Sequence, residues 1–350
     1  MKHWWKILGA ILMLYVLIGG FLIPLKSGIT DINPRKLTLG KDGNSSIVIS
    51  TYNTHLDEAS DNNVWLKTPA DKLIKATSAE VRSSNQLIAA FDYDGIVANS
   101  DSESTYTVII DNSIDGHFFY PDAVVLREPN TTGQEIPTYA LSELKHVDLF
   151  AFPYLPILYE TIRNTFFHVA IWFAMFLLLM YSCYHSARYL ITKDIHSDMR
   201  SSSVTSVGLF FGVAGILTGS IWAKYTWGTF WTTDIKLNMS ATALLVYFAY
   251  WILRGSISDR DTKARLSSVY NIFAFICLMF LVMVVPRMSE MDSLHPGNGG
   301  NPGLGGEDLD NTLRTVFYPA IIAYTLIGFW MAQLHYRFLV VKERIETKDF

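Results

Sequence analysis

Six long apolar runs constrain this 350-residue chain more than any other feature of its sequence. A run of about 20 apolar residues crosses the roughly 30 Å hydrocarbon core of a bilayer as an α-helix, because each backbone polar group then finds its partner within the helix. We therefore expect an all-α polytopic membrane protein with six transmembrane helices. The runs place these helices at residues 7–24, 166–184, 204–222, 240–254, 268–286 and 315–336.

The first run has two readings. Lys2, His3 and Lys6 precede it, as basic residues precede the apolar core of a signal peptide. The residues that follow, Leu22 to Ser27, contain no small-x-small cleavage pattern. This favours an uncleaved first transmembrane helix within residues 1–26.

The charges divide the chain into two parts. Residues 27–160 hold 19 of the 32 acidic residues but only 9 of the 28 basic ones, a net charge of −10. The remainder of the chain carries a net charge of +6. Over the whole chain, 17% of the residues are charged. We expect an acidic soluble domain at 27–160, inserted between the first helix and a five-helix membrane part at 161–345. No basic cluster of the kind that binds nucleic acid is present.

The basic residues also predict the orientation in the membrane. The N-terminal end, residues 185–203 and 254–265 and the C-terminal tail, read as connecting loops, carry 13 Lys and Arg residues together. The opposite short loops carry four, Lys224, Lys236, Arg287 and Arg314. Because basic loops stay in the cytoplasm, both termini are predicted to be cytoplasmic and residues 27–160 to face outward.

The inserted domain has the pattern of a small β-sandwich. Short apolar or alternating runs are separated by Asp, Asn, Gly and Ser turns, as in strands. These runs are Ser46–Tyr52, Gln86–Phe91, Thr105–Ile110 and Asp122–Leu126. Within this pattern, residues 70–81 also allow a short helix. His55, His117 and His146 are scattered, and we expect them to be surface or packing residues.

Three further features limit the chemistry. The outer loop at 287–314 is rich in Gly, Pro and Asn, a composition that cannot bury a core. Cys183 and Cys277 lie within apolar runs and are expected to be free thiols, and no Cys-x-x-Cys-His motif for covalent haem is present. No phosphate-binding Gly-x-x-x-x-Gly-Lys-[Ser/Thr] loop occurs, so any ATP would be used by a partner chain.

The segment from Trp222 to Asp234 carries Trp222, Trp227, Phe230 and Trp231 between two apolar runs. Aromatic side chains are enriched at membrane interfaces, so these residues can be interface anchors. They can equally form a platform for a large, flat, apolar ligand such as a porphyrin. The residue types alone leave both interpretations open.

The predicted topology brings two histidines to the membrane face that holds this aromatic segment. His168 lies near the outer end of the second helix, and His295 lies in the last outer loop. Each histidine is either a structural residue or one of two axial ligands of a haem iron. Nearby cations are either interface anchors or partners for the haem propionates. These cations are Lys224, Lys236, Arg163 and Arg287.

The stretch from Leu217 to Ser240 resembles the tryptophan-rich WWD domain of haem-handling cytochrome c assembly proteins. Within that group it is most similar to the cytochrome c maturation protein C (CcmC) family. The family pattern W-[GA]-K-x-x-W-G-T starts at Trp222, and Ile-Lys236-Leu follows Asp234 where the family has x-Arg-Leu. Ser293-Leu-His295 matches the family's Thr-Leu-His, and His168 matches its histidine in the second helix. The resemblance covers residues 158–345.

The chain departs from the family at several positions. Thr233 stands where the family has a tryptophan before the aspartate, and Phe230 replaces another tryptophan. Met291-Asp-Ser293 replaces two aromatic residues and a threonine. The insert at 27–160 is not part of the family pattern, so the resemblance does not assign its role. Its position and charge suggest that it docks a partner or shields the haem loop.

The resemblance implies a non-enzymatic, haem-handling protein of the bacterial inner membrane. It implies that haem b is held transiently and non-covalently at the periplasmic face and passed to a periplasmic haem chaperone. An ABC-type ATPase and permease subunits are the implied partners. Within the site, at 222–240 and the two histidines, the implied ligands are His168 and His295, with Trp222, Trp227, Phe230, Trp231 and Asp234 as the surface and Lys224, Lys236 and Arg163 as propionate contacts. The alternatives are a synthetase-type WWD protein, a permease subunit of an ABC-type transporter and a membrane-anchored binding protein whose function lies in the acidic domain.

Overall fold

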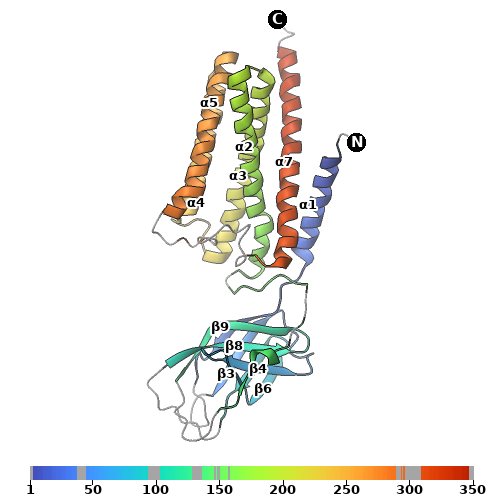
Figure 1. Ribbon diagram of the computed structural model, residues 1–350, viewed down its shortest axis with the longest axis vertical. Helices are drawn as coiled ribbons and strands as arrows, with labels where there is room; N and C mark the ends of the chain where they lie inside the picture. The colour runs from blue at the N-terminus through green and yellow to red at the C-terminus, as the bar shows by residue number, and fades with distance from the viewer. Residues whose placement is uncertain are drawn as a thin grey trace. The chain divides into compact units, whose positions relative to one another are not determined.

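The computed structural model describes residues 3–37, 45–93, 103–127, 136–145, 147, 150–156, 158–288, 293, 295 and 309–346. The chain forms two compact units, one of residues 1–23 and 160–350 and the other of residues 24–159 (Figure 1). Within the described residues, six helices are long and apolar enough to cross a membrane. The prediction of six such helices is therefore confirmed.

The helices of the first unit run alongside one another, with the start of α1 and the end of α7 at the same end of that unit (Figure 1). A short 3₁₀ segment, Tyr159–Phe166, precedes α2, and a π-helical turn, Phe280–Val284, joins α5 to α6 just before Pro286. The helices are α1 Trp4–Leu22, α2 His168–Thr192, α3 Ile195–Trp227, α4 Ile235–Ser256, α5 Arg260–Met279, α6 Val285–Met288 and α7 Asn311–Glu346.

Most helices extend beyond their apolar runs, so the loops predicted at 185–203 and 254–265 are largely wrong. Only residues 193–194 and 257–259 separate the helices there. Asp194 and Asp259 begin α3 and α5 by accepting hydrogen bonds from the backbone N–H groups of His196 and Thr262. Such caps let a helix continue through polar residues that hydropathy excludes.

The aromatic segment is also more helical than predicted. α3 continues through Trp227 and ends at Gly228, whose φ of 80° is readily adopted only without a side chain. The connection to α4 is therefore confined to residues 228–234. Trp222 and Lys224 lie on the last turns of a helix, which fixes the directions of their side chains.

The second unit contains two β-sheets. β1 Gly28–Asn33, β3 Ser46–Tyr52, β7 Gln86–Ala90 and β6 Ser78–Ser83 form one sheet in the order β1-β3-β7-β6. The other has the order β10-β5-β4-β8-β9-β2. Its strands are β10 Thr138–Tyr139, β5 Leu73–Lys75, β4 Asn62–Lys67, β8 Glu103–Asn112, β9 Gly116–Arg127 and β2 Lys36–Leu37.

Both sheets contribute to one apolar core. Ile47, Ile49 and Leu87 come from the first sheet and Val108 and Val124 from the second, and all are fully buried. β3 alternates buried and more exposed residues, as expected of a strand with one face in a core. The four predicted strands are confirmed, whereas their assembly into a β-sandwich stays a prediction.

The short helix that the sequence allows within 70–81 does not form. Leu73–Lys75 pairs with β4, and Ser78–Ser83 pairs with β7. Asp71, with φ of 59°, turns the chain before β5. Both strands pair with neighbours in the sequence, and β5 also pairs on its other edge with the distant strand β10, a contact that no local pattern could reveal.

The remaining predictions have mixed outcomes. His55 bonds Asp115 and His117 bonds the Lys145 carbonyl, whereas His146 lies outside the described residues. Cys183 and Cys277 are free thiols. Apart from Arg287, Met288, Ser293, His295 and residues 309–314, the Gly-rich loop predicted at 287–314 lies outside the described residues.

Candidate functional site

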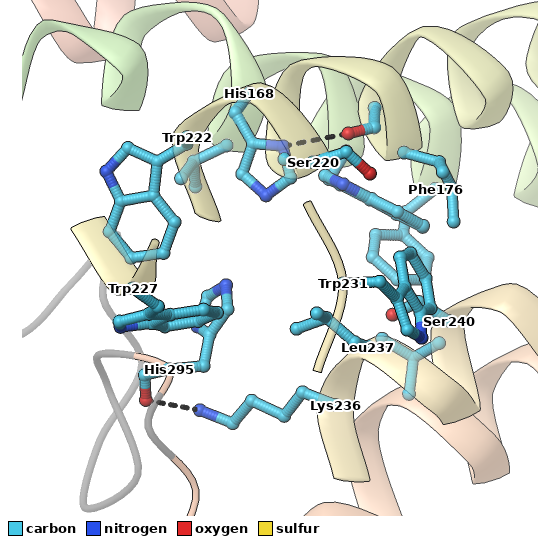
Figure 2. A pocket seen from close by; sticks show the side chains of 16 residues that line it. His168, Phe176, Ser220, Trp222, Trp227, Trp231, Lys236, Leu237, Ser240 and His295 are labelled. Atoms are coloured by element: carbon cyan, nitrogen blue, oxygen red, sulfur yellow. Dashed lines mark hydrogen bonds between the residues drawn. The ribbon is translucent and has the colours of Figure 1, made fainter. Parts of the chain in front are cut away.

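A pocket lies where the N-terminal turns of α2 and α4 meet the C-terminal turns of α3 (Figure 2). Its cavity volume is about 180 Å³, and the pocket opens to its surroundings. Its lining is mostly apolar, as is typical of small-molecule sites. The lining residues are His168, Val169, Trp172, Phe176, Gly215, Ile216, Gly219, Ser220, Trp222, Trp227, Trp231, Lys236, Leu237, Ser240, Val282 and His295.

Three of the predicted aromatic residues line this pocket. Trp222 and Trp227 pack edge to face, with ring centroids 5.0 Å apart and an interplanar angle of 73°. The indole N–H of Trp231 donates to the side-chain oxygen of Asn238 on α4. The pocket therefore has rigid aromatic walls, as a flat apolar ligand requires. Phe230, 59% exposed, does not line it.

The two predicted histidines also meet in this pocket, although 127 residues separate them. Their ring centroids are 6.3 Å apart and their planes make an angle of 45°. Figure 2 shows the two rings on facing sides of the opening, with Trp227 beside His295 and Trp222 near His168. Two coaxial imidazoles whose nitrogens each lie about 2 Å from one metal ion have centroids about 6 Å apart. The spacing therefore fits an iron held between the two histidines.

Hydrogen bonding fixes the tautomer of His168. Its Nδ1 lies 3.0 Å from the Gly215 carbonyl oxygen, which can only accept, so Nδ1 carries the proton and donates. Nδ1 is also 3.2 Å from the hydroxyl oxygen of Thr218, and that hydroxyl donates to the Ala214 and Gly215 carbonyls. In the neutral ring Nε2 then keeps its lone pair. Histidines that bind metals characteristically donate their other ring N–H to a carbonyl in this way.

Four glycines on α3 make room for four larger side chains on α2. A Cβ added at Gly219 would lie 2.6 Å from Cε1 of His168, and one added at Gly215 would lie 2.8 Å from the indole nitrogen of Trp172. A Cβ added at Gly212 would lie 3.0 Å from Sδ of Met175. A Cβ added at Gly208 would lie 2.7 Å from Cδ2 of Leu179. We call these pairs the glycine ladder. It brings α3 close to α2 and seats the His168 ring against α3.

Asp234 and its neighbours connect the start of α4 to the segment of His295. One carboxylate oxygen of Asp234 accepts from the backbone N–H of Lys236 at 2.8 Å, which caps α4. The other accepts from the Ser293 hydroxyl at 2.7 Å. The Nζ of Lys236, a pocket residue, lies 3.4 Å from the backbone oxygen of His295. Asp234 thus lies behind the pocket wall and is not among the lining residues.

The other predicted cations lie away from the lining of this pocket. Lys224 donates to the Gly228 carbonyl and stacks over the Phe230 ring. Arg163 donates to the Gly20 and Ile23 carbonyls at the end of α1 and pairs with Glu160. Arg287 donates to the carbonyl of Met283. Lys236 is the one predicted cation among the residues that line the pocket.

Several pocket residues were missed at the level of sequence. Trp172 and Phe176 follow His168 at intervals of four, so all three share one face of α2, and that spacing was available as a signal. Asn238 supports the connection from behind, since its amide also donates to the Thr233 carbonyl. Nothing in the sequence marked Asn238.

Comparison with known proteins matches this chain to a family. Residues 149–350 match the family described as CcmC, Heme exporter protein C. A "Heme exporter protein C" from Bradyrhizobium diazoefficiens is 24% identical over 188 residues, which cover 53% of this chain and 70% of that protein. The protein of the same name from Paracoccus denitrificans is 22% identical, covering 54% of this chain and 74% of its own length.

A weaker similarity extends beyond that family. The "Cytochrome c biogenesis protein CcsA" of Fagopyrum esculentum is 27% identical over 99 residues, 28% of this chain and 30% of that protein. The family match covers more than half of the chain and includes every residue that lines the pocket. This chain is therefore a multi-pass membrane protein of cytochrome c biogenesis and belongs to the CcmC family, heme exporter protein C.

Proposed function

We propose that this protein holds haem b non-covalently in the pocket between His168 and His295 and delivers it to a periplasmic haem chaperone. The observation that carries the proposal is the histidine pair, with centroids 6.3 Å apart inside an aromatic pocket. The hydrogen bond from Nδ1 of His168 to Gly215 supports it, because the lone pair of Nε2 remains for iron.

The walls of the pocket suit the rest of the porphyrin. Trp172, Phe176 and Val282 offer an apolar lining for the macrocycle, and the tryptophans offer flat faces. Lys236 is the cation best situated for a propionate, since it lines the pocket. We assign Lys224 and Arg163 to secondary positions, because their side chains already contact backbone carbonyls elsewhere.

We further propose that both termini are cytoplasmic and that the pocket opens at the periplasmic face of a bacterial inner membrane. The excess of basic residues at the opposite end of the helices supports this orientation. The β-rich unit would then be periplasmic, and its shared core supports a β-sandwich. We assign it to docking a partner or shielding the haem segment, so deletion of 27–160 should impair cytochrome c maturation.

Haem is the cargo in this proposal, and the protein performs no covalent chemistry on it. Attachment of haem to a cytochrome takes place on partner proteins, and an ABC-type ATPase with its permease subunits supplies any energy. Non-covalent ligation by two neutral imidazoles suits a cargo that must leave, because each bond can be exchanged for a ligand on the chaperone.

The test is haem binding by the purified full-length protein in detergent. The wild-type protein should show the absorption spectrum of low-spin haem with two histidine ligands. The double variant His168→Ala/His295→Ala should lose most of the haem and this spectrum, whereas His196→Ala, a histidine on α3 that bonds Tyr336, should bind as wild type. A double variant that keeps full haem with an unchanged spectrum would exclude these ligands.

We keep a synthetase-type WWD protein as the second candidate function, because over 28% of its length the chain also resembles a cytochrome c biogenesis protein of another name, CcsA. The two functions differ in the product. Incubation of the haem-loaded protein with apocytochrome c alone gives a covalent haem adduct only if this chain is a synthetase.

A further inference from the structure

We infer that the Asp234–Ser293 hydrogen bond positions His295 and thereby sets the affinity and spin state of the haem that the pocket holds. This inference rests on the proposed function. It concerns two residues that do not line the pocket, and it gives the aspartate of the WWD segment a role distinct from contact with haem.

The inference starts from the burial of Asp234. The residue is 8% exposed, although it carries a carboxylate at the end of a connecting segment. A buried carboxylate requires hydrogen bonds on its oxygens to offset the cost of leaving water. One oxygen accepts from the N–H of Lys236 at 2.8 Å, which any capping residue would satisfy. The other oxygen accepts from the Ser293 hydroxyl at 2.7 Å. This second bond requires a side chain with two oxygens, one to cap the helix and one to reach Ser293.

Ser293 continues the connection to His295. Its hydroxyl proton is donated to Asp234, so its oxygen is left to accept, and the backbone N–H of His295 lies 3.2 Å from it. The serine is thus a two-sided link between the cap of α4 and the backbone of the histidine. A bond to a charged acceptor, such as the first of these two, is among the stronger hydrogen bonds in proteins.

A second contact acts on the same backbone. Nζ of Lys236 lies 3.4 Å from the carbonyl oxygen of His295, so a side chain from the first turn of α4 also contacts the backbone of this histidine. The imidazole of His295 packs against both Trp222 and Trp227, with centroid distances of 5.8 and 6.4 Å. Backbone bonds to a helix end and ring contacts together fix where this imidazole lies.

This connection matters because His295 has less support from its own element than His168. His168 begins a 25-residue helix and is seated against α3. His295 belongs to no helix or strand of the described residues. A ligand displaced by about 1 Å no longer bonds a metal at the required distance, so a histidine outside a rigid element needs such support.

The test compares four variants of the full-length protein. Ser293→Ala removes the hydroxyl, and Ser293→Thr keeps it. Asp234→Ser keeps a capping oxygen for α4 but is too short to reach Ser293 as well. Asp259→Ser makes the same change at the cap of α5, where the carboxylate accepts from Thr262, and serves as the matched control.

Two readouts are measured. In the haem-loaded protein, Ser293→Ala and Asp234→Ser should weaken haem binding about three- to tenfold, as expected for one hydrogen bond. Their spectra should also gain a high-spin component, and added imidazole should restore the low-spin form. Ser293→Thr and Asp259→Ser should match the wild type. In the haem-free protein, hydrogen exchange at the His295 amide should quicken in Ser293→Ala but not in Ser293→Thr.

The outcomes separate this inference from the proposed function. Wild-type spectra and unchanged amide exchange in Ser293→Ala would overturn the inference while leaving the haem site intact. A wild-type protein without a two-histidine spectrum would overturn the proposed function, and with it any effect of Ser293 on haem. Amide exchange in the haem-free protein would still report whether Ser293 holds the backbone of His295.

Discussion

His168 is held in place by the helix that faces it. The Gly215 carbonyl and the Thr218 hydroxyl orient its Nδ1, and Gly219 leaves space for its ring. Each of these residues is one or two turns from the tryptophan segment on the same helix. The histidine and the aromatic platform are therefore built on one pair of helices, α2 and α3.

Replacement of Gly219 by alanine should displace the His168 ring. The added Cβ would lie 2.6 Å from Cε1, well inside van der Waals contact. Alanine favours a helix over glycine by about 1 kcal/mol, so any loss has to come from the displaced ring. We expect at least tenfold weaker haem binding and a high-spin spectrum, measured by titration with ferric haem. Gly255→Ala, where no atom lies within 4 Å, is the control, and equal behaviour of the two variants would contradict this prediction.

His55 in the β-rich unit provides a pH-dependent contact. Its Nδ1 lies 2.9 Å from Asp115, and this hydrogen bond raises the pKa of His55 above its ordinary value of about 6.5. A raised pKa in the folded protein means that the protonated form stabilises the fold. That contribution is complete below pH about 6.5 and is lost as the pH rises through the raised pKa.

Asp115→Asn should bring the pKa of His55 back to its ordinary value or below. The part of the stability change that comes from the His55 ring should be under about 1 kcal/mol at pH 6, because half of the imidazole is exposed, and this part should shrink at pH 9. The titration of the His55 ring by NMR measures the pKa directly. A wild-type pKa at or below 6.5 would refute the prediction.

Small and polar side chains hold the helices together at the level of elements. The glycine ladder brings α2 and α3 into close contact at one end of the unit. Further along α2, the side-chain amide of Asn271 on α5 donates to the hydroxyls of Ser182, Ser186 and Ser201. Close approach and interhelical hydrogen bonds are what associates helices in lipid, where burial of apolar surface gives little driving force.

Gly212→Val should destabilise the helical unit at a contact whose residues do not line the pocket. A Cβ at Gly212 would lie 2.5 Å from Leu244 and 3.0 Å from Met175, so valine overpacks the contact of α3 with α2 and α4. We expect a cost of about 1–3 kcal/mol, seen as a lower midpoint of thermal unfolding in detergent. Leu217→Val, at an exposed position of α3, controls for the β-branched side chain. A midpoint no lower than that of Leu217→Val would show that the contact adjusts freely.

At the scale of the whole molecule, the chain has two units with separate cores. The core of the β-rich unit is built from residues between Ile29 and Ile136, and the core of the helical unit from residues between Ile171 and Ala332. Each unit therefore buries its own apolar residues.

The β-rich unit should fold on its own. Residues 24–159 expressed as a separate polypeptide should give a circular dichroism spectrum dominated by strands and a cooperative urea transition, because their core uses only their own side chains. Addition of the fragment to the full-length protein should leave haem binding unchanged, since the lining residues that the structure describes all belong to the helical unit. A fragment without a cooperative transition would mean that it requires the membrane unit.

The residue pattern anticipated a good part of this protein. Apolar runs fix membrane helices because the bilayer demands about 20 apolar residues in a row, and all six appear in the structure. The tryptophan segment, with His168 and His295, identified the family because a motif is a local property of the chain. Alternation identified the strands at Ser46–Tyr52 and Gln86–Ala90 for the same reason.

Contacts between distant residues were decided only in three dimensions. Gly219 against His168, Asp234 with Ser293 and Asn271 with three serines each join segments that no periodicity relates. The strand Leu73–Lys75 also pairs with Thr138–Tyr139, which lies far along the chain. By itself the sequence determined which segments are apolar enough to cross a membrane, and it supplied the candidate haem-binding residues. The tertiary structure decided which of them share a pocket, because that depends on helix packing and hydrogen bonds across dozens of residues.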